Sequence, residues 1–183
     1  MQNALVVPGP VRPGPPVSPL ELAQLVSVVA SQPARWHPTV RFDPARRWFA
    51  QLELTTDLEV WLLSWLPGQG TGFHDHYISS VGLCCARGVV REDLMVYGEG
   101  HGEAQLGSGD SRRGGPGYIH RVRHALGEPA VTIHVYSPRL DWVGQYRLDD
   151  STGVVRREVR PGRNELTDQL VAEGALHRVL ERF

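Results

Sequence analysis

The chain has 183 residues, of which 41% are hydrophobic and 21% are charged, proportions typical of one globular domain with its own core. A formal net charge of −1 gives nucleic acid and anionic membranes no electrostatic attraction, so neither is an expected partner. No apolar run approaches the roughly 20 residues of a membrane span, and no secretion signal is recognisable. The adjacent Cys84 and Cys85 cannot form an ordinary long-range disulfide. We therefore expect a cytoplasmic protein.

The N-terminal part of the chain predicts a tail followed by a helix. Residues 1–18 include the segment VPGPVRPGPP, whose composition predicts a flexible, extended tail. Ser18 and Pro19 then provide an N-cap and a proline at the first helical position. Apolar residues follow with helical spacing, so an amphipathic helix is predicted over residues 19–32.

The middle of the chain is a series of short apolar segments separated by turn residues, which predict strands. These segments cover residues 48–54, 58–66, 71–76, 81–86, 89–96, 118–123, 131–137, 142–148 and 154–159. Arg87 and Gly88 predict a hairpin turn, and the glycine-rich residues 98–117 predict loops with one short strand. The pattern indicates an all-β sandwich or barrel over residues 19–160, which includes the N-terminal helix. Helical spacing returns at the end and predicts a C-terminal helical extension over residues 161–183.

The segment GQGTGFHDH contains the first chemical signal. His74 and His76 are one residue apart, so on an extended strand both rings point to the same face and form two corners of a metal site. Three other histidines lie on predicted strands, namely His120, His124 and His134. Of these, His124 is interpreted as a structural histidine.

The spacing of these residues resembles the cupin superfamily. Gly68 precedes the HxH pair of His74 and His76 with five residues between, and His120 follows a Pro-Gly turn. The resemblance covers roughly residues 40–150. It implies a cupin barrel, that is, a jelly-roll-like double-stranded β-helix, with His74, His76 and His120 as metal ligands. The cupin pattern usually adds a glutamate ligand, but Ser80 and Val81 occupy those positions.

The loss of that glutamate leaves three neutral imidazoles around a divalent metal ion, with open positions on one face. Such an arrangement suits a redox metal that holds substrate and O₂ together. Three histidines also bind hydrolytic zinc, so the ligand set alone leaves the metal open.

A second resemblance is more specific. The sequence HRV at residues 120–122, followed by EPAVTIHVYSP at 128–138, resembles the thiol dioxygenases and the cysteine dioxygenases in particular. That family reads LHRV and then EPAVSLHLYSP, with HDH upstream. The resemblance implies Fe(II) as the cofactor and a reaction in which both atoms of O₂ add to the sulfur of a small thiol. The most favoured conversion is L-cysteine to cysteine sulfinate.

Thr132, His134 and Tyr136 match the catalytic Ser–His–Tyr relay of this family, with threonine keeping the hydroxyl. The three residues alternate along a predicted strand, so they share one face. The hydroxyl can fix the imidazole tautomer, and the imidazole can orient the phenol of Tyr136 toward substrate. In animal members a cysteine crosslinks to the active-site tyrosine. Its position here is Val81, so no thioether is expected.

The substrate-binding positions depart from the family. Cysteine dioxygenases bind the substrate carboxylate with an arginine in a Tyr-x-Arg segment, and Gln51 stands at that position. Glutamine offers a neutral NH₂ in place of a bidentate charged fork. Arg46 or Arg47 supplies the charge if the register shifts. Thiol dioxygenases with glutamine there are linked to 3-mercaptopropionate, whereas the Ser-Pro pair after Tyr136 resembles the arginine type, so both substrates stay open.

Two other classes of protein also stay open. One is a non-catalytic cupin that binds a metal or small ligand, which is favoured by Gln51 and by the bulky Tyr77 and Ile78 where bacterial relatives carry glycines. The other is a zinc hydrolase, although no carboxylate base is evident among the matched positions. We expect a monomer or weak homo-oligomer whose partners are the small thiol and O₂.

Overall fold

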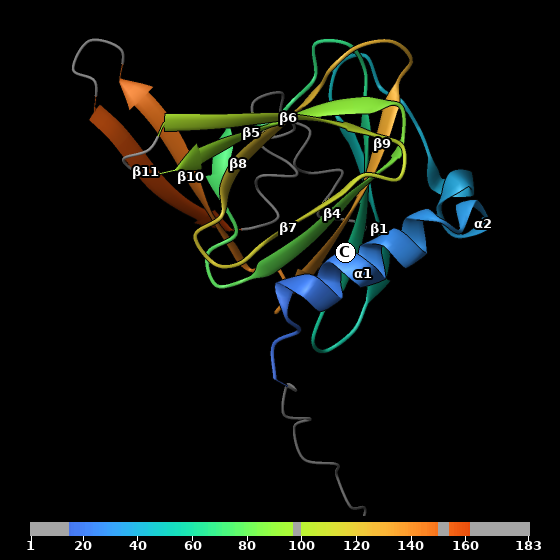
Figure 1. The fold of residues 1–183 in the computed structure, drawn as a ribbon, viewed down its shortest axis with the longest axis horizontal. Coiled ribbons are helices and arrows are strands. Elements are labelled where there is room, and N and C mark those ends of the chain that lie inside the picture. Colours follow the sequence, from blue (N-terminus) through green and yellow to red (C-terminus); the bar gives the residue numbers. More distant parts are fainter. Residues whose placement is uncertain (1–14, 97–99, 150–153, 162–183) are drawn as a thin grey trace, which may run out of the picture.

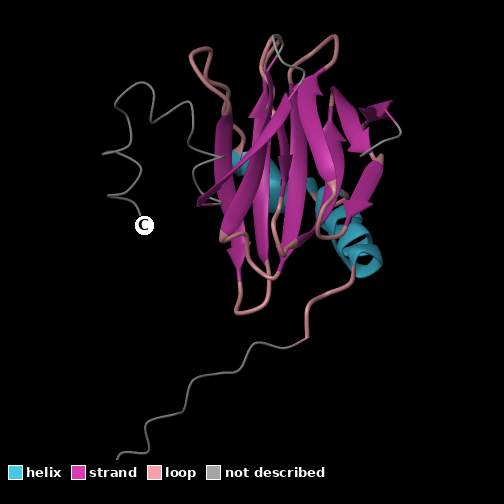
Figure 2. Cartoon of the chain, turned by 90° about the vertical axis from the view of Figure 1, so that its left-hand side faces the viewer, coloured by secondary structure: helices cyan, strands magenta, loops and turns pink. Residues whose placement is uncertain are grey.

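A computed structural model describes residues 15–96, 100–149 and 154–161 of the chain (Figure 1). Its elements are α1 (Pro19–Ala30), α2 (Pro33–Trp36), a 3₁₀ turn (His37–Thr39), β1 (Trp48–Leu54), β2 (Glu59–Trp65), β3 (Phe73–Asp75), β4 (Ser80–Arg87), β5 (Val89–Val96), β6 (Gly100–Gly107), β7 (Ser111–Gly114), β8 (Ile119–His124), β9 (Ala130–Ser137), β10 (Trp142–Asp149) and β11 (Val154–Pro161). Figure 2 shows strands making up nearly the whole body of the domain.

The strands form two antiparallel sheets. One has five strands in the order β1-β2-β9-β4-β7, and the other has six in the order β11-β10-β3-β8-β5-β6. Chain neighbours such as β4 and β5 lie in different sheets, so the chain repeatedly crosses from one sheet to the other. This arrangement confirms the predicted all-β fold of two facing sheets.

Alternation along the strands separates the inside of the sandwich from its outside. On β2, Trp61, Leu63 and Trp65 belong to the core between the two sheets. Alternate residues of β9, such as Val131 and Ile133, instead belong to a second core beneath helix α1. The same alternation sends Thr132, His134 and Tyr136 inward, because side chains on a strand change face at every residue.

Helix α1 closes the outer face of the five-stranded sheet (Figure 1). The predicted N-cap is present as a capping box, in which Ser18 and Glu21 exchange side-chain and backbone hydrogen bonds. The helix approaches β4 at Gly82, where an added Cβ would lie 2.4 Å from the carbonyl oxygen of Leu22. Only glycine leaves room for the helix backbone at this distance.

Two local predictions are wrong. Arg87 and Gly88 do not form a hairpin turn, because β4 pairs with β7 and β9 while β5 pairs with β6 and β8. Gly88 has a φ of +75°, and an added Cβ would lie 2.8 Å from Cα of Ala130, so it provides a tight crossing between sheets. The glycine-rich segment also contains two strands, β6 and β7, which lie at sheet edges and tolerate glycine there.

The predicted C-terminal helix lies outside the described residues, as does most of the predicted N-terminal tail. Within the described ranges, no helix has the length and apolar character needed to cross a membrane.

Candidate metal centre

Three histidines from two strands meet inside the sandwich. His74 on β3 pairs in register with His120 on β8, and His76 follows directly after β3. Their ring centroids are 4.6 to 5.1 Å apart, and one ring nitrogen from each lies within 4.8 Å of the others. All three side chains are buried. The structure therefore brings together the three histidines that the cupin spacing indicates.

The unsatisfied nitrogen atoms of this cluster fit a metal ion. Within the described part of the chain, both ring nitrogens of His76 and Nε2 of His120 are buried without a hydrogen-bond partner. Leaving a buried polar atom unsatisfied costs about 1–3 kcal/mol, and a metal ion would accept these lone pairs. Nδ1 of His74 lies 3.0 Å from the carbonyl oxygen of Gly72. A carbonyl only accepts, so Nδ1 carries the proton and the lone pair of the ring is on Nε2.

His74 and His76 are held neutral, which is the form that metal binding requires. Burial, followed by the neighbouring His120, lowers the pKa of His74 and of His76 well below its ordinary value. Their lone pairs are consequently not blocked by protons near pH 7.

The Thr–His–Tyr row on β9 forms a continuous hydrogen-bonded chain. The hydroxyl of Thr132 lies 2.9 Å from Nε2 of His134, and Nδ1 of His134 lies 3.2 Å from the hydroxyl of Tyr136. Trp65 on β2 extends this chain, because its indole N–H donates to the hydroxyl of Thr132 at 2.9 Å. The ring of Tyr136 lies 5.0 Å from that of His76, so the chain ends at the histidine cluster.

The strand opposite Tyr136 contributes no sulfur to it. Val81 on β4 is the register partner of Tyr136, whereas Cys85 pairs with Thr132. Both Cys84 and Cys85 are free and buried, and burial raises the pKa of each thiol to about 11. This environment is typical of packing residues and not of reactive thiols.

The side chain of Gln51 contacts a buried carboxylate of its own sheet. Gln51 pairs in register with Trp61, on the inner face of the sheet, and its side-chain Nε2 donates to Oε2 of Glu59 at 3.5 Å. The other oxygen of Glu59 accepts from the backbone N–H of Leu140 at 2.9 Å. Gln51 is thus tied to a buried acidic group on the neighbouring strand.

Of the two arginines before β1, only Arg47 reaches the interior. Its side chain is buried and stacks on Trp65, with Cζ of Arg47 lying 5.0 Å from the centroid of the indole ring. Burial, followed by the charges of His120 and Arg47, lowers the pKa of His134 well below its ordinary value. Arg46 instead pairs with Asp43 at 3.1 Å in a half-exposed position. Of these two arginines, Arg47 is therefore the one that lies toward the candidate centre.

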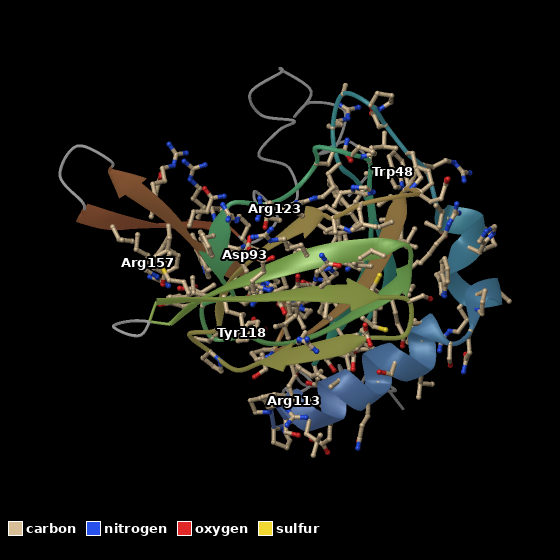
Figure 3. The ribbon with its side chains drawn as sticks, turned by 45° about the horizontal axis from the view of Figure 1, so that its top comes forward. Trp48, Asp93, Arg113, Tyr118, Arg123 and Arg157 are labelled. Carbon is tan, nitrogen blue, oxygen red and sulfur yellow. The ribbon has the colours of Figure 1, made fainter. Side chains whose placement is uncertain are left out.

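Asp75 points away from the centre, as its position between two inward histidines predicts. Its carboxylate accepts from Nε and Nη2 of Arg157 at 2.8 and 3.0 Å, and from the hydroxyl of Tyr146 at 2.6 Å. Figure 3 labels Arg157 at the β10–β11 end of the molecule. This ion pair joins the histidine strand to the last described hairpin.

Two contacts of the centre were not anticipated from the sequence. One is the donation from Trp65 to Thr132, and the other is a buried carboxylate, Glu92, which lies 2.7 Å from Nδ1 of His120. For Glu92 a signal exists in the strand VVREDLMV, where an acidic residue shares a face with Val90. For Trp65 no signal exists, because its partner is 67 residues away.

The two facing sheets and the buried cluster of three histidines define a cupin-type double-stranded β-helix protein. Solved structures agree with this class. The protein TT1209 from Thermus thermophilus is 26% identical, with a TM-score of 0.50 over 56% of this chain and 93% of that one. A protein with a double-stranded β-helix domain from Klebsiella pneumoniae is 22% identical, with a TM-score of 0.50 over 56% and 80% of the two chains, and supports the fold alone.

Sequence comparison identifies the family within this class. The profile of cysteine dioxygenase type I matches residues 17–149, so the chain belongs to the cysteine dioxygenase type I family. Cysteine dioxygenase type 1 of Bos taurus is 27% identical over 143 residues, which are 73% of this chain and 70% of the relative. The Homo sapiens protein of the same name is 26% identical over 150 residues, with 76% and 74% covered.

Proposed function

We propose that the protein is a non-haem Fe(II) thiol dioxygenase that converts L-cysteine to cysteine sulfinate, with His74, His76 and His120 as iron ligands. The observation that carries this proposal is the meeting of the β9 relay with the histidine cluster, where the rings of Tyr136 and His76 are 5.0 Å apart. The reaction balances without a reductant, because a thiolate RS⁻ and O₂ together give the sulfinate RSO₂⁻.

The donor set supports a redox metal with open positions. Three neutral imidazoles leave about half of an octahedral coordination sphere available. Bound Fe(II) would bind the substrate thiolate and supply the electrons that activate O₂. A metal-bound thiol also loses its proton more easily, so the substrate would enter the reaction as thiolate near neutral pH.

The relay residues act on the position of the phenol. Trp65 donates a hydrogen bond to the hydroxyl of Thr132. This hydroxyl can in turn donate a hydrogen bond to Nε2 of His134. Nδ1 of His134 then carries a proton and donates to the oxygen of Tyr136. The phenol of Tyr136 is thereby oriented so that its hydrogen can be donated to substrate or oxygen beside the centre.

Arg47 is the residue proposed to bind the substrate carboxylate. Its guanidinium lies on the inner side and its charge acts on both His74 and His134. A buried guanidinium binds carboxylate more strongly than a neutral amide does. In this assignment Gln51 is held by Glu59 on the neighbouring strand, and Arg47 takes the role that an arginine at position 51 would have.

An alternative substrate is 3-mercaptopropionate, which the presence of glutamine at residue 51 favours. Both thiols have a carboxylate, so they differ by the amine that cysteine carries. Protein loaded with Fe(II) without oxygen should form cysteine sulfinate when cysteine and O₂ are added, with a higher kcat/KM than for 3-mercaptopropionate. The reverse order would assign the alternative substrate.

A non-catalytic metal-binding cupin is distinguished by the same experiment. It predicts a protein that takes up a metal ion but consumes no O₂ with any small thiol. That result would overturn the proposed activity and leave the metal site in place.

A further inference from the structure

Glu92 lies fully buried on β5, beside the third histidine of the centre. Its side chain is 0% exposed, and Oε1 lies 2.7 Å from Nδ1 of His120. The hydroxyl of Tyr118, labelled in Figure 3, donates to the same oxygen at 3.0 Å. A carboxylate is almost never fully buried unless its partners compensate for lost hydration. The hydrogen bonds from His120 and Tyr118 provide this compensation for Glu92.

The chemistry of the two groups decides the direction of the hydrogen bond. Oε1 of Glu92 already accepts from the hydroxyl of Tyr118, so it is an acceptor for His120 too, and Nδ1 of His120 carries the proton and donates to it. Nε2 of His120 then presents its lone pair, and within the described residues this atom is buried without a hydrogen-bond partner. The contact with Glu92 therefore selects the tautomer that can bind a metal at Nε2.

The carboxylate of Glu92 would also offset part of the positive charge of a bound metal ion. Three neutral imidazoles offset none of the charge of a divalent ion, and Ser80 and Val81 occupy the positions where the cupin pattern has a ligand glutamate. Arg112 lies 3.6 Å from Oε2 of Glu92, but its side chain is 39% exposed. Solvent screens that exposed cation, whereas the contact with His120 is dry and is screened much less.

We propose that Glu92 is a positioning residue of the metal centre, which holds His120 in its Nδ1–H form and supplies, through that imidazole, the negative charge that other cupins supply by direct ligation. The inference rests on the metal site of the proposed function but not on its substrate. A carboxylate behind a histidine orients the ring and makes it a stronger donor to the metal.

The test is the affinity of the protein for Co(II), measured by competition with a chromophoric chelator. Loss of an outer carboxylate of this kind typically weakens metal binding about 10- to 100-fold, so Glu92→Gln should raise the Kd for Co(II) by about that factor. The matched control is Glu103→Gln, because Glu103 is an exposed carboxylate on the adjacent β6 that pairs with Arg91. This control should bind Co(II) like the unaltered protein.

An unchanged Co(II) affinity in folded Glu92→Gln protein would overturn the inference. A purely structural role is recognised by a lower melting temperature of the metal-free protein with the Co(II) affinity retained. Because Co(II) binding needs no thiol oxidation, a failure of the proposed dioxygenase activity would leave this result intact, so the two failures are distinguishable.

A second measurement uses the unaltered chain and does not depend on whether the variant folds. Long-range ¹H–¹⁵N NMR correlations of the Zn(II)-loaded protein report which ring nitrogen of each histidine carries hydrogen. His120 should carry it on Nδ1, with a strongly downfield proton because its acceptor is a carboxylate. A proton on Nε2 of His120 would contradict the inference.

Discussion

Val81 and Tyr136 lie directly opposite each other on β4 and β9. The resemblance to animal cysteine dioxygenases implies that a cysteine at the position of Val81 would face the tyrosine with which it crosslinks. The valine thus leaves the phenol of Tyr136 without a sulfur partner on the facing strand. Cys85 pairs in register with Thr132, four residues before Tyr136, so the register favours the expectation that no thioether forms.

This register predicts that a cysteine introduced by Val81→Cys will form a thioether with the ring of Tyr136. During turnover with Fe(II), cysteine and O₂, the introduced thiol and the ring of Tyr136 should lose one hydrogen each, with O₂ as the oxidant. Intact-protein mass spectrometry should detect a loss of about 2 Da. The unaltered protein should keep its mass, and an unchanged mass of the variant after many turnovers would contradict the proposed facing geometry.

Removal of the phenol hydroxyl should affect the chemical step. Tyr136→Phe keeps the ring against His76 but removes the oxygen that His134 orients. Positioned acid–base groups contribute about 10²–10⁴-fold, so kcat should fall by at least about 10²-fold with iron content unchanged. Tyr77→Phe is the control, because Tyr77 is half-exposed. Equal activity of the two variants would remove Tyr136 from the mechanism.

Among the groups of the substrate, Arg47 should act on the carboxylate. A hydrogen bond to a charged group contributes about 1.5–3 kcal/mol, so Arg47→Gln should raise KM for both cysteine and 3-mercaptopropionate by about 10- to 100-fold. Cysteamine has the thiol and amine but no carboxylate, and its KM should not change. Arg46→Gln is the matched control, since Arg46 pairs with Asp43. Equal effects on all three thiols would refute carboxylate binding by Arg47.

The ion pair behind the histidine strand should stabilise the fold. Arg157→Gln leaves the buried carboxylate of Asp75 with one charged partner fewer, and an undersatisfied buried acceptor costs about 1–3 kcal/mol. Chemical denaturation should therefore show a lower free energy of unfolding. Arg160→Gln alters an arginine of the same strand that pairs with Glu158 and should have little effect. A stability equal to that of the control would show that the pair is energetically neutral.

The two cysteines should be unreactive at ordinary pH. Burial raises the pKa of both Cys84 and Cys85 from the ordinary 9.0 to about 11, so the folded protein holds them as thiols until the pH approaches 11. Alkylation by iodoacetamide should be very slow at pH 8 and fast only in denaturant. The thiol form that folding favours contributes stability below pH 9, and that contribution is lost as pH rises toward 11. Rapid labelling of the folded protein at pH 8 would contradict this environment.

The sequence contains enough information to place His74 beside His76 and to align the three residues of the β9 row, because both depend on local alternation. His74 and His76 share a face by spacing, and the residues of β9 do so for the same reason. The third ligand, His120, needed the resemblance to cupins, since no local rule pairs β3 with β8. The fold class followed from many short strands with turn residues between them.

The remaining features depend on which strands become neighbours, which periodicity does not report. A glycine such as Gly88 suggests a hairpin turn because glycine readily adopts the positive φ that such turns need. The same positive φ also allows the chain to cross from one sheet to the other at Gly88. The register of β1 shifts between Gln51 and Glu53, and no pattern in that short strand indicates such a bulge. The contact between Glu92 and His120 joins residues 28 apart in the chain, so only the folded sheet brings them together.

The most direct test of the central claim follows the oxygen atoms. Protein loaded with Fe(II) without oxygen is mixed with L-cysteine and ¹⁸O₂, and the product is examined by mass spectrometry. Dioxygenation by a centre of His74, His76 and His120 predicts cysteine sulfinate carrying two ¹⁸O atoms, with one O₂ consumed for each cysteine. Failure to form a sulfinate from any small thiol, in protein shown to contain iron, would contradict the account.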